Sequence, residues 1–229
     1  MKLGPSRLKL THRAVINRKE NKALINSYLN GDIEWFDKSL SKIKKQIRII
    51  LRKEQDNRCI YCRRIIKGER RNSTEDIEHF LDKSKQYYKK WAFSPLNLTL
   101  ACHPCNMVKS TKDLGDMTLR QARKIQNGIG QFKWLHPYFD DYHDNIEINE
   151  GWLYSVKNNA PNVAAASKMI SDCELDKIEK IEEASEYIKK RQERITMLIS
   201  TALEKERYER AKKLTKWLKS EQKNNWFNY

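Results

Sequence analysis

Apolar residues recur every three or four positions between about Ile33 and Lys53. They are Phe36, Leu40, Ile43, Ile47, Ile50 and Leu51, and this spacing places side chains on one face of a helix. The opposite face would carry Lys38, Lys42, Lys44, Lys45, Arg48 and Arg52. Such a basic face either meets solvent on a helix packed against a core or contacts phosphate groups. The pattern leaves both interpretations open.

A second periodic pattern runs from about Leu175 to Lys219 and predicts one or two long helices. Its apolar members are Ile178, Ile181, Ile188, Ile195, Leu198, Ala202, Leu203, Ala211, Leu214 and Leu218. Aromatic side chains stand near its end, at Trp217, Trp226 and Phe227. These aromatics could form a docking face for a partner, but a stripe of this kind is more often core, and we favour core.

Between the two helical patterns, residues 74–81 (TEDIEHFL) and 97–101 (NLTLA) have the composition of short strands. Pro104 stands where a helix can begin, because proline is well tolerated at the first helical position. That helix would run over residues 106–109 and end before Gly115. Alternation along the first strand puts Glu78 and His79 on opposite faces unless the strand bulges or ends there.

The 229 residues suffice for one medium domain, or for a small core with flanking elements. With 46 lysines and arginines against 30 acids, the formal net charge is +16. The excess lies in residues 1–57, at +8, and 58–119, at +5, whereas residues 120–175 carry −1 and 176–229 carry +4. This balance favours a polyanionic partner, of which nucleic acid is the commonest. A generic basic, soluble protein is the alternative.

The first ten residues alternate basic and apolar types without the apolar run of a secretory signal. The longest mostly apolar stretch, residues 195–203, is far shorter than the roughly 20 residues that span a bilayer. We therefore expect a soluble, cytoplasmic protein with no membrane association. Disulfides are rare in that compartment, so paired cysteines indicate metal ligands.

Four of the five cysteines form two C-x-x-C pairs, Cys59 with Cys62 and Cys102 with Cys105. Two such knuckles supply the four thiolates of a closed, tetrahedral structural zinc site. The 39 residues between the pairs exceed the spacing of a plain zinc ribbon, so something else is held between the knuckles. Cys173 has no partner at ligand spacing and is expected to be a small buried apolar residue.

The order C-x-x-C, IEHF-x-x-KS and NLTLAC-x-x-CN-x-x-KS, from Cys59 to Lys112, resembles the HNH endonucleases. These are ββα-metal nucleases whose core is a zinc-braced hairpin and helix. The resemblance implies an α+β, mostly helical chain in which this core is flanked by N- and C-terminal helices. The expected regions are a basic helical region at 1–57, the nuclease core at 58–115 and a largely helical region at 116–229.

A narrower group is also similar, the HNH proteins that accompany ATPases in Septu-type and retron antiphage systems. The similarity lies in the IEHF form of the motif, the approach to the second strand over residues 91–97, and the later string EINEGWLY. Residues 1–57 depart from that group. This resemblance implies a defence effector that works with an ATPase partner.

The HNH resemblance implies a role for each motif residue. His79 would be the general base that takes a proton from the attacking water, as a group with a pKa near 6.5 can do at neutral pH. Glu78 would bind the catalytic divalent metal, with Asn106 as second ligand where many relatives have histidine. Oxygen donors of this kind suit Mg²⁺ or Mn²⁺. Asn97 would hydrogen-bond the backbone or the imidazole and hold His79 in position, and the products would be a 5′-phosphate and a 3′-hydroxyl.

Further polar residues have less specific roles. Lys109 and Lys112 on the short helix would contact phosphates or serve only as solubilising charges, and Lys44 and Lys45 are expected to bind nucleic acid from the basic helix. We favour Asp76 as a structural acid at the start of the strand rather than a metal ligand. The acids and histidine at 140–144 are expected to be hydrated loop residues, His103 to point outward beside the zinc, and His12 and His136 to carry no chemistry.

The leading hypothesis is a metal-dependent HNH nuclease that hydrolyses DNA, with RNA left open as a substrate. One alternative is a zinc-containing module that binds nucleic acid without cleaving it. Binding alone has no use for Glu78, His79 and Asn106 together, which argues against this alternative. The other alternative is a subunit that stays nearly silent until a partner engages it. Sequence specificity and oligomeric state are not indicated by the sequence.

Overall fold

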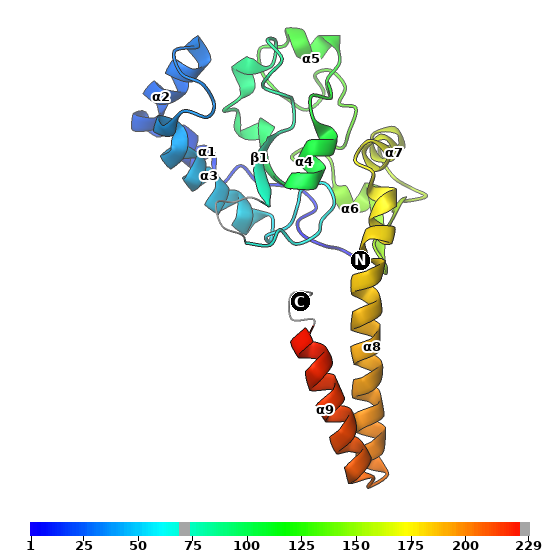
Figure 1. Ribbon diagram of the computed structural model, residues 1–229. Helices are drawn as coiled ribbons and strands as arrows, with labels where there is room; N and C mark the ends of the chain where they lie inside the picture. The colour runs from blue at the N-terminus through cyan, green and yellow to red at the C-terminus, as the bar shows by residue number, and fades with distance from the viewer. Residues whose placement is uncertain (69–73, 225–229) are drawn as a thin grey trace. The chain divides into compact units, whose positions relative to one another are not determined.

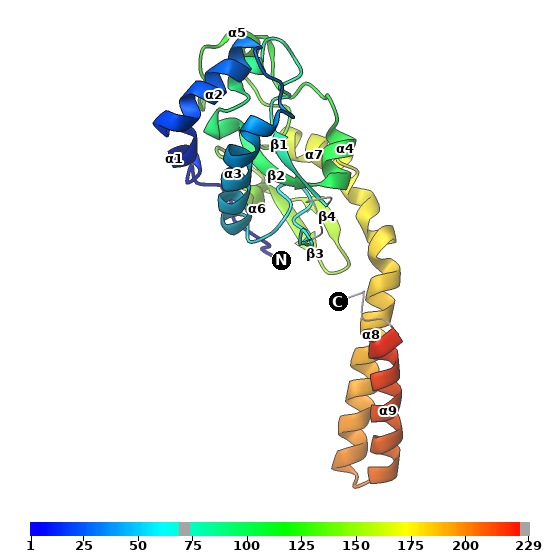
Figure 2. The same cartoon turned by 60° about the vertical axis from the view of Figure 1, so that its left-hand side comes forward.

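The computed structural model describes residues 1–68 and 74–224, without the side chains of 180–186, 223 and 224. The strands are β1 (Glu75–His79), β2 (Leu98–Cys102), β3 (Ile146–Asn149) and β4 (Leu153–Val156). The α-helices are α1 (Arg13–Ile16), α2 (Lys19–Asn30), α3 (Ser41–Glu54), α4 (His103–Lys109), α5 (Met117–Gln121), α6 (Tyr142–Asn145), α7 (Val163–Asp172), α8 (Ile178–Glu204) and α9 (Tyr208–Asn224). The chain is α+β and about half helical (Figure 1), with two small antiparallel sheets, β1 with β2 and β3 with β4 (Figure 2).

The chain divides into two compact units. The first comprises residues 1–149 and 154–176, and the second comprises residues 150–153 and those from 177 onward. The boundaries expected after residues 57 and 115 therefore fall inside the first unit. The reason is that α3 of the N-terminal region packs directly on β2, so the basic helices and the strand–loop–strand–helix segment share one core.

Helix α3 confirms the apolar spacing only from Leu40 onward. Ile43, Ile47 and Leu51 are buried on its inner face. The predicted helix also included Phe36, which is 86% exposed and lies before α3. The carboxylate of Asp37 accepts a hydrogen bond from the backbone N–H of Ser39 and begins a short 3₁₀ turn, Lys38–Leu40, so the helical phase starts there and not at Ile33.

The two predicted strands pair in antiparallel register, with Glu75 opposite Cys102 and His79 opposite Leu98. Helix α4 follows β2 without a loop and packs against both strands. Figure 2 shows this hairpin with α4 beside it and α3 nearby. The predicted order of strand, long loop, strand and short helix is confirmed. Helix α4 ends at Lys109 because Ser110 takes a positive φ of 48°.

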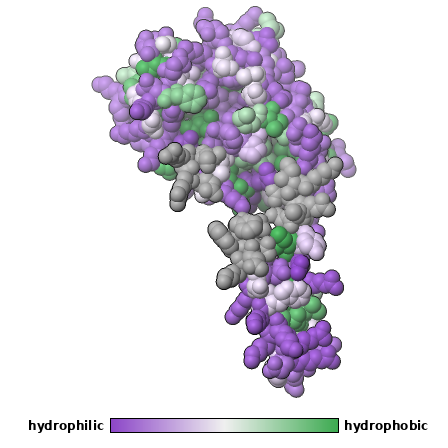
Figure 3. All heavy atoms as spheres, in the orientation of Figure 1, coloured by the Kyte–Doolittle hydropathy of each residue, from purple (hydrophilic) through white to green (hydrophobic). Residues whose placement is uncertain are grey.

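The second unit contains the two long C-terminal helices, which pack against each other. Ile195, Ala202 and Ala211 are buried between them, as expected for core positions. Leu198, Leu203 and Trp217 are 39%, 49% and 44% exposed, so the expectation that they are core is wrong for these three. Trp226 and Phe227 lie outside the described residues. The visible face of this helix pair is mainly hydrophilic (Figure 3). Among the described residues, no helix has the length and apolarity needed to cross a membrane.

Candidate functional site

The four paired cysteines converge in the first unit. Their sulfur atoms all lie within 4.8 Å of one another, and Sγ of Cys62 is 3.8 Å from Sγ of Cys102. A tetrahedral zinc site with Zn–S bonds of ~2.3 Å has S–S edges of about 3.8 Å. The cluster is a possible metal site that is compatible with structural zinc. Cys173, by contrast, is buried apart from the cluster, as expected.

Local backbone geometry forms both knuckles. The first follows α3, where the N–H of Cys59 donates to the carbonyl of Arg64 and the N–H of Arg63 donates back to that of Cys59. Arg63 takes a positive φ of 60° to close this turn. The second knuckle uses the end of β2 for Cys102 and the first turn of α4 for Cys105, with Pro104 between them at a position that lacks a helical hydrogen bond anyway.

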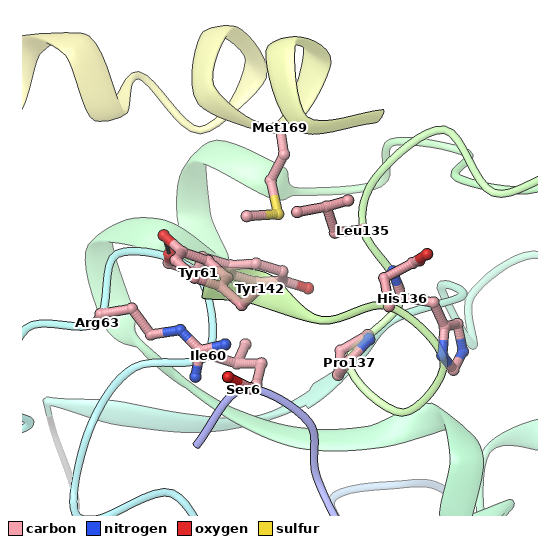
Figure 4. A pocket seen from close by; sticks show the side chains of 10 residues that line it. Ser6, Ile60, Tyr61, Arg63, Leu135, His136, Pro137, Tyr142 and Met169 are labelled. Atoms are coloured by element: carbon pink, nitrogen blue, oxygen red, sulfur yellow. Dashed lines mark hydrogen bonds between the residues drawn. The ribbon is translucent and has the colours of Figure 1, made fainter. Parts of the chain in front are cut away.

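Arg63 extends from the first knuckle into a small cavity of about 10 Å³, which has room for about one water molecule. Figure 4 shows its guanidinium beside Tyr61 and Tyr142, with Met169 and Leu135 on the far side. The guanidinium carbon lies 4.0 Å from the Tyr142 ring centre. Nε and Nη1 are buried without a hydrogen-bond partner. Burial lowers the pKa of Arg63, and the nearby Cys59 and Cys62 sulfurs oppose that shift.

His79 stands at the end of β1 and is only 5% exposed. Its Nε2 lies 3.1 Å from the carbonyl oxygen of Ala92. That oxygen can only accept, so Nε2 carries the proton and Nδ1 keeps its lone pair. Nδ1 has no hydrogen-bond partner within the described part of the chain, and it is not among the buried unpartnered atoms. Burial, reinforced by the charges of Lys83 and Lys109, holds the pKa of His79 well below its ordinary value, so the ring is neutral at pH 7.

Glu78 faces the other way from His79, as alternation along the strand predicts. Its Oε1 lies 2.5 Å from Nζ of Lys109 and accepts a hydrogen bond from the hydroxyl of Tyr61. Lys109 is 2% exposed and also donates to the carbonyl of His79. The expectation that Lys109 contacts DNA phosphates is therefore wrong for this structure, since its ammonium is enclosed by β1. Burial raises the pKa of Glu78, and the neighbouring Lys109 charge opposes this rise.

Asn106 does not hydrogen-bond Glu78. Its Nδ2 donates to Oδ2 of Asp76 at 2.9 Å, and the same oxygen lies 2.9 Å from Nδ1 of His103. Asp76 and Glu78 are two residues apart on β1 and therefore share the face that α4 covers. Asp76, which the sequence favours as a structural acid, thus lies beside Asn106 and His103. His103 is exposed, as expected.

Asn97 is buried and binds only backbone groups. Its Oδ1 accepts from the N–H of Leu81, and its Nδ2 donates to the carbonyls of Leu81 and Trp91. Of the two expected partners, the backbone is the one present and the imidazole is not. Asn97 ties down both ends of the loop that supplies the Ala92 carbonyl to His79.

The other lysines expected to bind nucleic acid differ in their surroundings. Nζ of Lys112 donates to the carbonyl of Val108 and so completes the C-terminal end of α4. Nζ of Lys44 donates to the carbonyl of Trp35, whereas Lys45 is exposed. Arg48 and Arg52 pair with the buried carboxylate of Glu75. The basic face of α3 is therefore neither wholly solvated nor wholly available to phosphates.

The other titratable groups serve the fold. Asp140 accepts from the N–H of His136, and Asp141 caps α6 by accepting from the N–H of Asp144. His143 bonds the carbonyl of Gly4, and His12 bonds that of Pro95. Among groups of three or more histidine, cysteine or acidic residues within 1–68 and 74–224, only the four cysteines are close enough to hold a metal.

Two residues that position the site gave no signal in the sequence. Buried Gln55, at the end of α3, donates to the carbonyls of Arg58 and Leu100 and accepts from the N–H of Leu100. It thereby joins α3, the first knuckle and β2. Trp35 packs edge to face on His79, with ring centres 4.5 Å apart. A lone glutamine or tryptophan has no spacing pattern from which such a contact could be predicted.

No protein-family model, curated protein or solved structure matches the chain.

Proposed function

We propose that the protein is a metal-dependent endonuclease of the HNH type that hydrolyses DNA phosphodiester bonds. The observation that carries this proposal is the state of His79. Its Nε2–H is committed to the Ala92 carbonyl, so the unprotonated Nδ1 remains to accept a proton from a water molecule. The unpartnered ring nitrogens of His12, His136 and His143 are buried, whereas Nδ1 of His79 is not among the buried unpartnered atoms of the described residues.

The four cysteines would hold structural zinc, which joins the first knuckle to the hairpin and α4. Zinc with four thiolates carries a net negative charge, and Arg63, buried without an acidic partner, supplies a countercharge. This zinc would fix the end of β2 and the start of α4, and thereby the position of Asn106 relative to β1.

Glu78 and Asn106, with Asp76, would hold the catalytic Mg²⁺ or Mn²⁺. Each of these residues has one side-chain oxygen without a hydrogen-bond partner in the described part of the chain: Oε2 of Glu78, Oδ1 of Asn106 and Oδ1 of Asp76. Three oxygen donors are the ligand type that these hard cations prefer. The ion would supply neutralising charge at the scissile phosphate and at the leaving oxygen.

The chain's own residues then perform the proton transfer. His79 would accept the proton of the attacking water at Nδ1, while the Ala92 carbonyl keeps the ring in one tautomer. Asn97 would hold that carbonyl in place through the Leu81 and Trp91 backbone. The expected products are a 5′-phosphate and a 3′-hydroxyl.

We further propose that the protein acts in the cytoplasm as an antiphage effector with an ATPase partner. The near-complete burial of His79 and Glu78 supports regulation by a partner, because a phosphodiester needs an opening to reach either group. The Glu78–Lys109 ion pair favours the second candidate, a zinc-containing module that binds nucleic acid without cutting it, since that pair competes with a metal for the carboxylate.

The test uses supercoiled plasmid with the full-length protein in Mg²⁺, Mn²⁺, Ca²⁺ or no added metal. Nicking or linearisation in Mg²⁺ or Mn²⁺, with product ends that DNA ligase rejoins directly, supports the nuclease. Ligase requires the 5′-phosphate and 3′-hydroxyl that hydrolysis at this site would leave. Plasmid binding without cleavage in every metal, also after addition of the product of the neighbouring gene, would favour the binding module. A single-stranded RNA in parallel tests the other substrate.

A further inference from the structure

Three separate parts of the chain meet around the indole of Trp35. His79 comes from the end of β1, Lys44 from α3, and Lys83 from the loop after β1. The ammonium nitrogens of Lys44 and Lys83 lie 5.4 Å and 5.3 Å from the ring centre. Trp35 is 9% exposed, and its carbonyl accepts a hydrogen bond from Lys44. The neighbouring ring of Phe93, with its centre 5.2 Å away, supports the indole.

Neither ammonium group forms a close ion pair within the described part of the chain. In the described part of the chain, Lys44 and Lys83 form no ion pair with a carboxylate, whereas the nearby Lys109 is paired with Glu78. Both lysines are partly buried, and burial lowers the pKa of each. The charges of Arg48 and then Lys83 add to this effect on Lys44. The carboxylates of Asp37 near Lys44, and of Asp82 and Glu78 near Lys83, oppose it without forming close ion pairs with these lysines. Two like charges beside one ring repel each other, and a ring face offers only a partial negative charge in return.

We propose that Lys44 and Lys83 form a binding site for a backbone phosphate of nucleic acid, beside His79 and above the Trp35 indole. Both nitrogens are near the same ring centre, so they are at most about 11 Å apart. That separation suits one phosphate or two neighbouring ones. The site rests on the proposed function, because it would deliver the phosphodiester to the unprotonated Nδ1 of His79.

A phosphate fits these groups better than other anions would. Ammonium groups act as point charges and bind phosphate oxygens without needing the planar geometry that favours arginine for carboxylates. The chain's net charge of +16 would draw a polyanion toward the first unit, which contains most of the excess. Trp35 could instead stack on an unpaired base, and the test below separates that use from phosphate binding.

The test measures binding of a fluorescein-labelled DNA duplex by anisotropy, without added divalent metal, over a range of salt concentrations. Lys44→Met and Lys83→Met remove one charge each and keep the apolar stem. Lys42→Met, exposed on the same helix, and Lys85→Met, in the same loop, are matched controls. Each site variant should bind roughly tenfold more weakly. Each should also lower the slope of log K against log salt by about 1, whereas the controls should change neither.

Equal losses in site variants and controls would overturn the proposal, because the affinity would then come from the overall field. Unchanged binding in both site variants would also overturn it. If affinity for single-stranded DNA falls with Trp35→Leu but not with the lysine variants, the indole stacks on bases and the phosphate site is wrong. Zinc content and circular dichroism confirm that each variant is folded.

The outcome is separable from that of the nuclease proposal because this assay needs no cleavage. Wild-type protein that never cuts, with binding losses confined to Lys44→Met and Lys83→Met, would keep the phosphate site and refute the nuclease. Wild-type protein that cuts, with both lysine variants binding and cutting normally, would keep the nuclease and refute the phosphate site.

Discussion

The buried ion pair between Lys109 and Glu78 makes a quantitative prediction. The two side chains are 2% and 3% exposed, and the Lys109 ammonium also donates to the His79 carbonyl. Lys109→Met keeps most of the side-chain volume and removes the charge. The Glu78 carboxylate is then left in the interior with only the Tyr61 hydroxyl as a hydrogen-bond donor. An unpaired charge in that position must be neutralised or exposed to water.

Removing one partner of a buried ion pair costs about 3–5 kcal/mol of unfolding free energy. That is a large share of the roughly 5–15 kcal/mol by which proteins of this size are stable. The cost should depend on pH, because burial already holds the pKa of Glu78 above its ordinary value and the variant loses the opposing Lys109 charge. A carboxyl whose pKa is raised in the folded state does not lower the free energy of unfolding while it is protonated. The free energy of unfolding falls as the pH rises through that pKa and the carboxyl ionises. The variant should therefore be closer to wild type at pH 5 than at pH 7.

The assay is urea unfolding followed by circular dichroism at both pH values. The matched control is the double variant Lys109→Met with Glu78→Gln, in which no charge remains to be neutralised. It should recover most of the lost free energy, and the double-mutant cycle gives the coupling between the two groups. A loss below about 1 kcal/mol for Lys109→Met at pH 7, with no recovery in the double variant, would refute the buried pair.

Three further predictions concern metal, acid and the site. The purified protein should contain about one zinc per chain, and Cys105→Ser should lose it; metal analysis that finds none contradicts the cysteine cluster as a zinc site. The unfolding free energy should fall between pH 6.5 and pH 4, with about 3 kcal/mol from His12, because burial lowers its pKa from 6.5 to about 4 and the unfolded state takes up the proton first; His12→Gln should remove that share of the fall measured by urea unfolding, whereas His79, His136 and His143, whose pKa values burial also lowers, keep the rest. Asn106→Ala should abolish plasmid cleavage and keep zinc; loss of zinc as well would mean that Asn106 serves the fold.

The hairpin and its helix were predictable because their signals are local. Cysteine spacing, strand alternation around Ile77 and the position of Pro104 each act within a few residues, and together they define β1, β2 and α4. The apolar face of α3 from Leu40 onward was predictable for the same reason. Its start was not, since Trp35 and Phe36 are equally apolar and only the turn at Asp37 decides which of them is buried.

The interior of the candidate site depends on contacts between distant segments. Lys109 looks like a surface lysine on a short helix until β1 places the Glu78 carboxylate against it. Asp76 looks like an ordinary acid at the start of a strand until α4 presents Asn106 and His103 to it. Residues that lie 27 to 31 positions apart show no period that would reveal such pairs.

The measurement that tests the central claim most directly is the rate of plasmid cleavage by His79→Ala in Mg²⁺ or Mn²⁺, beside wild type and His103→Ala. His103 is an exposed histidine next to a cysteine ligand, so its variant controls for loss of an imidazole near the zinc. The account predicts cleavage by wild type and by His103→Ala, and a rate at least about a hundredfold lower for His79→Ala with zinc retained. Equal cleavage by His79→Ala and wild type would contradict the assignment of His79 as the general base.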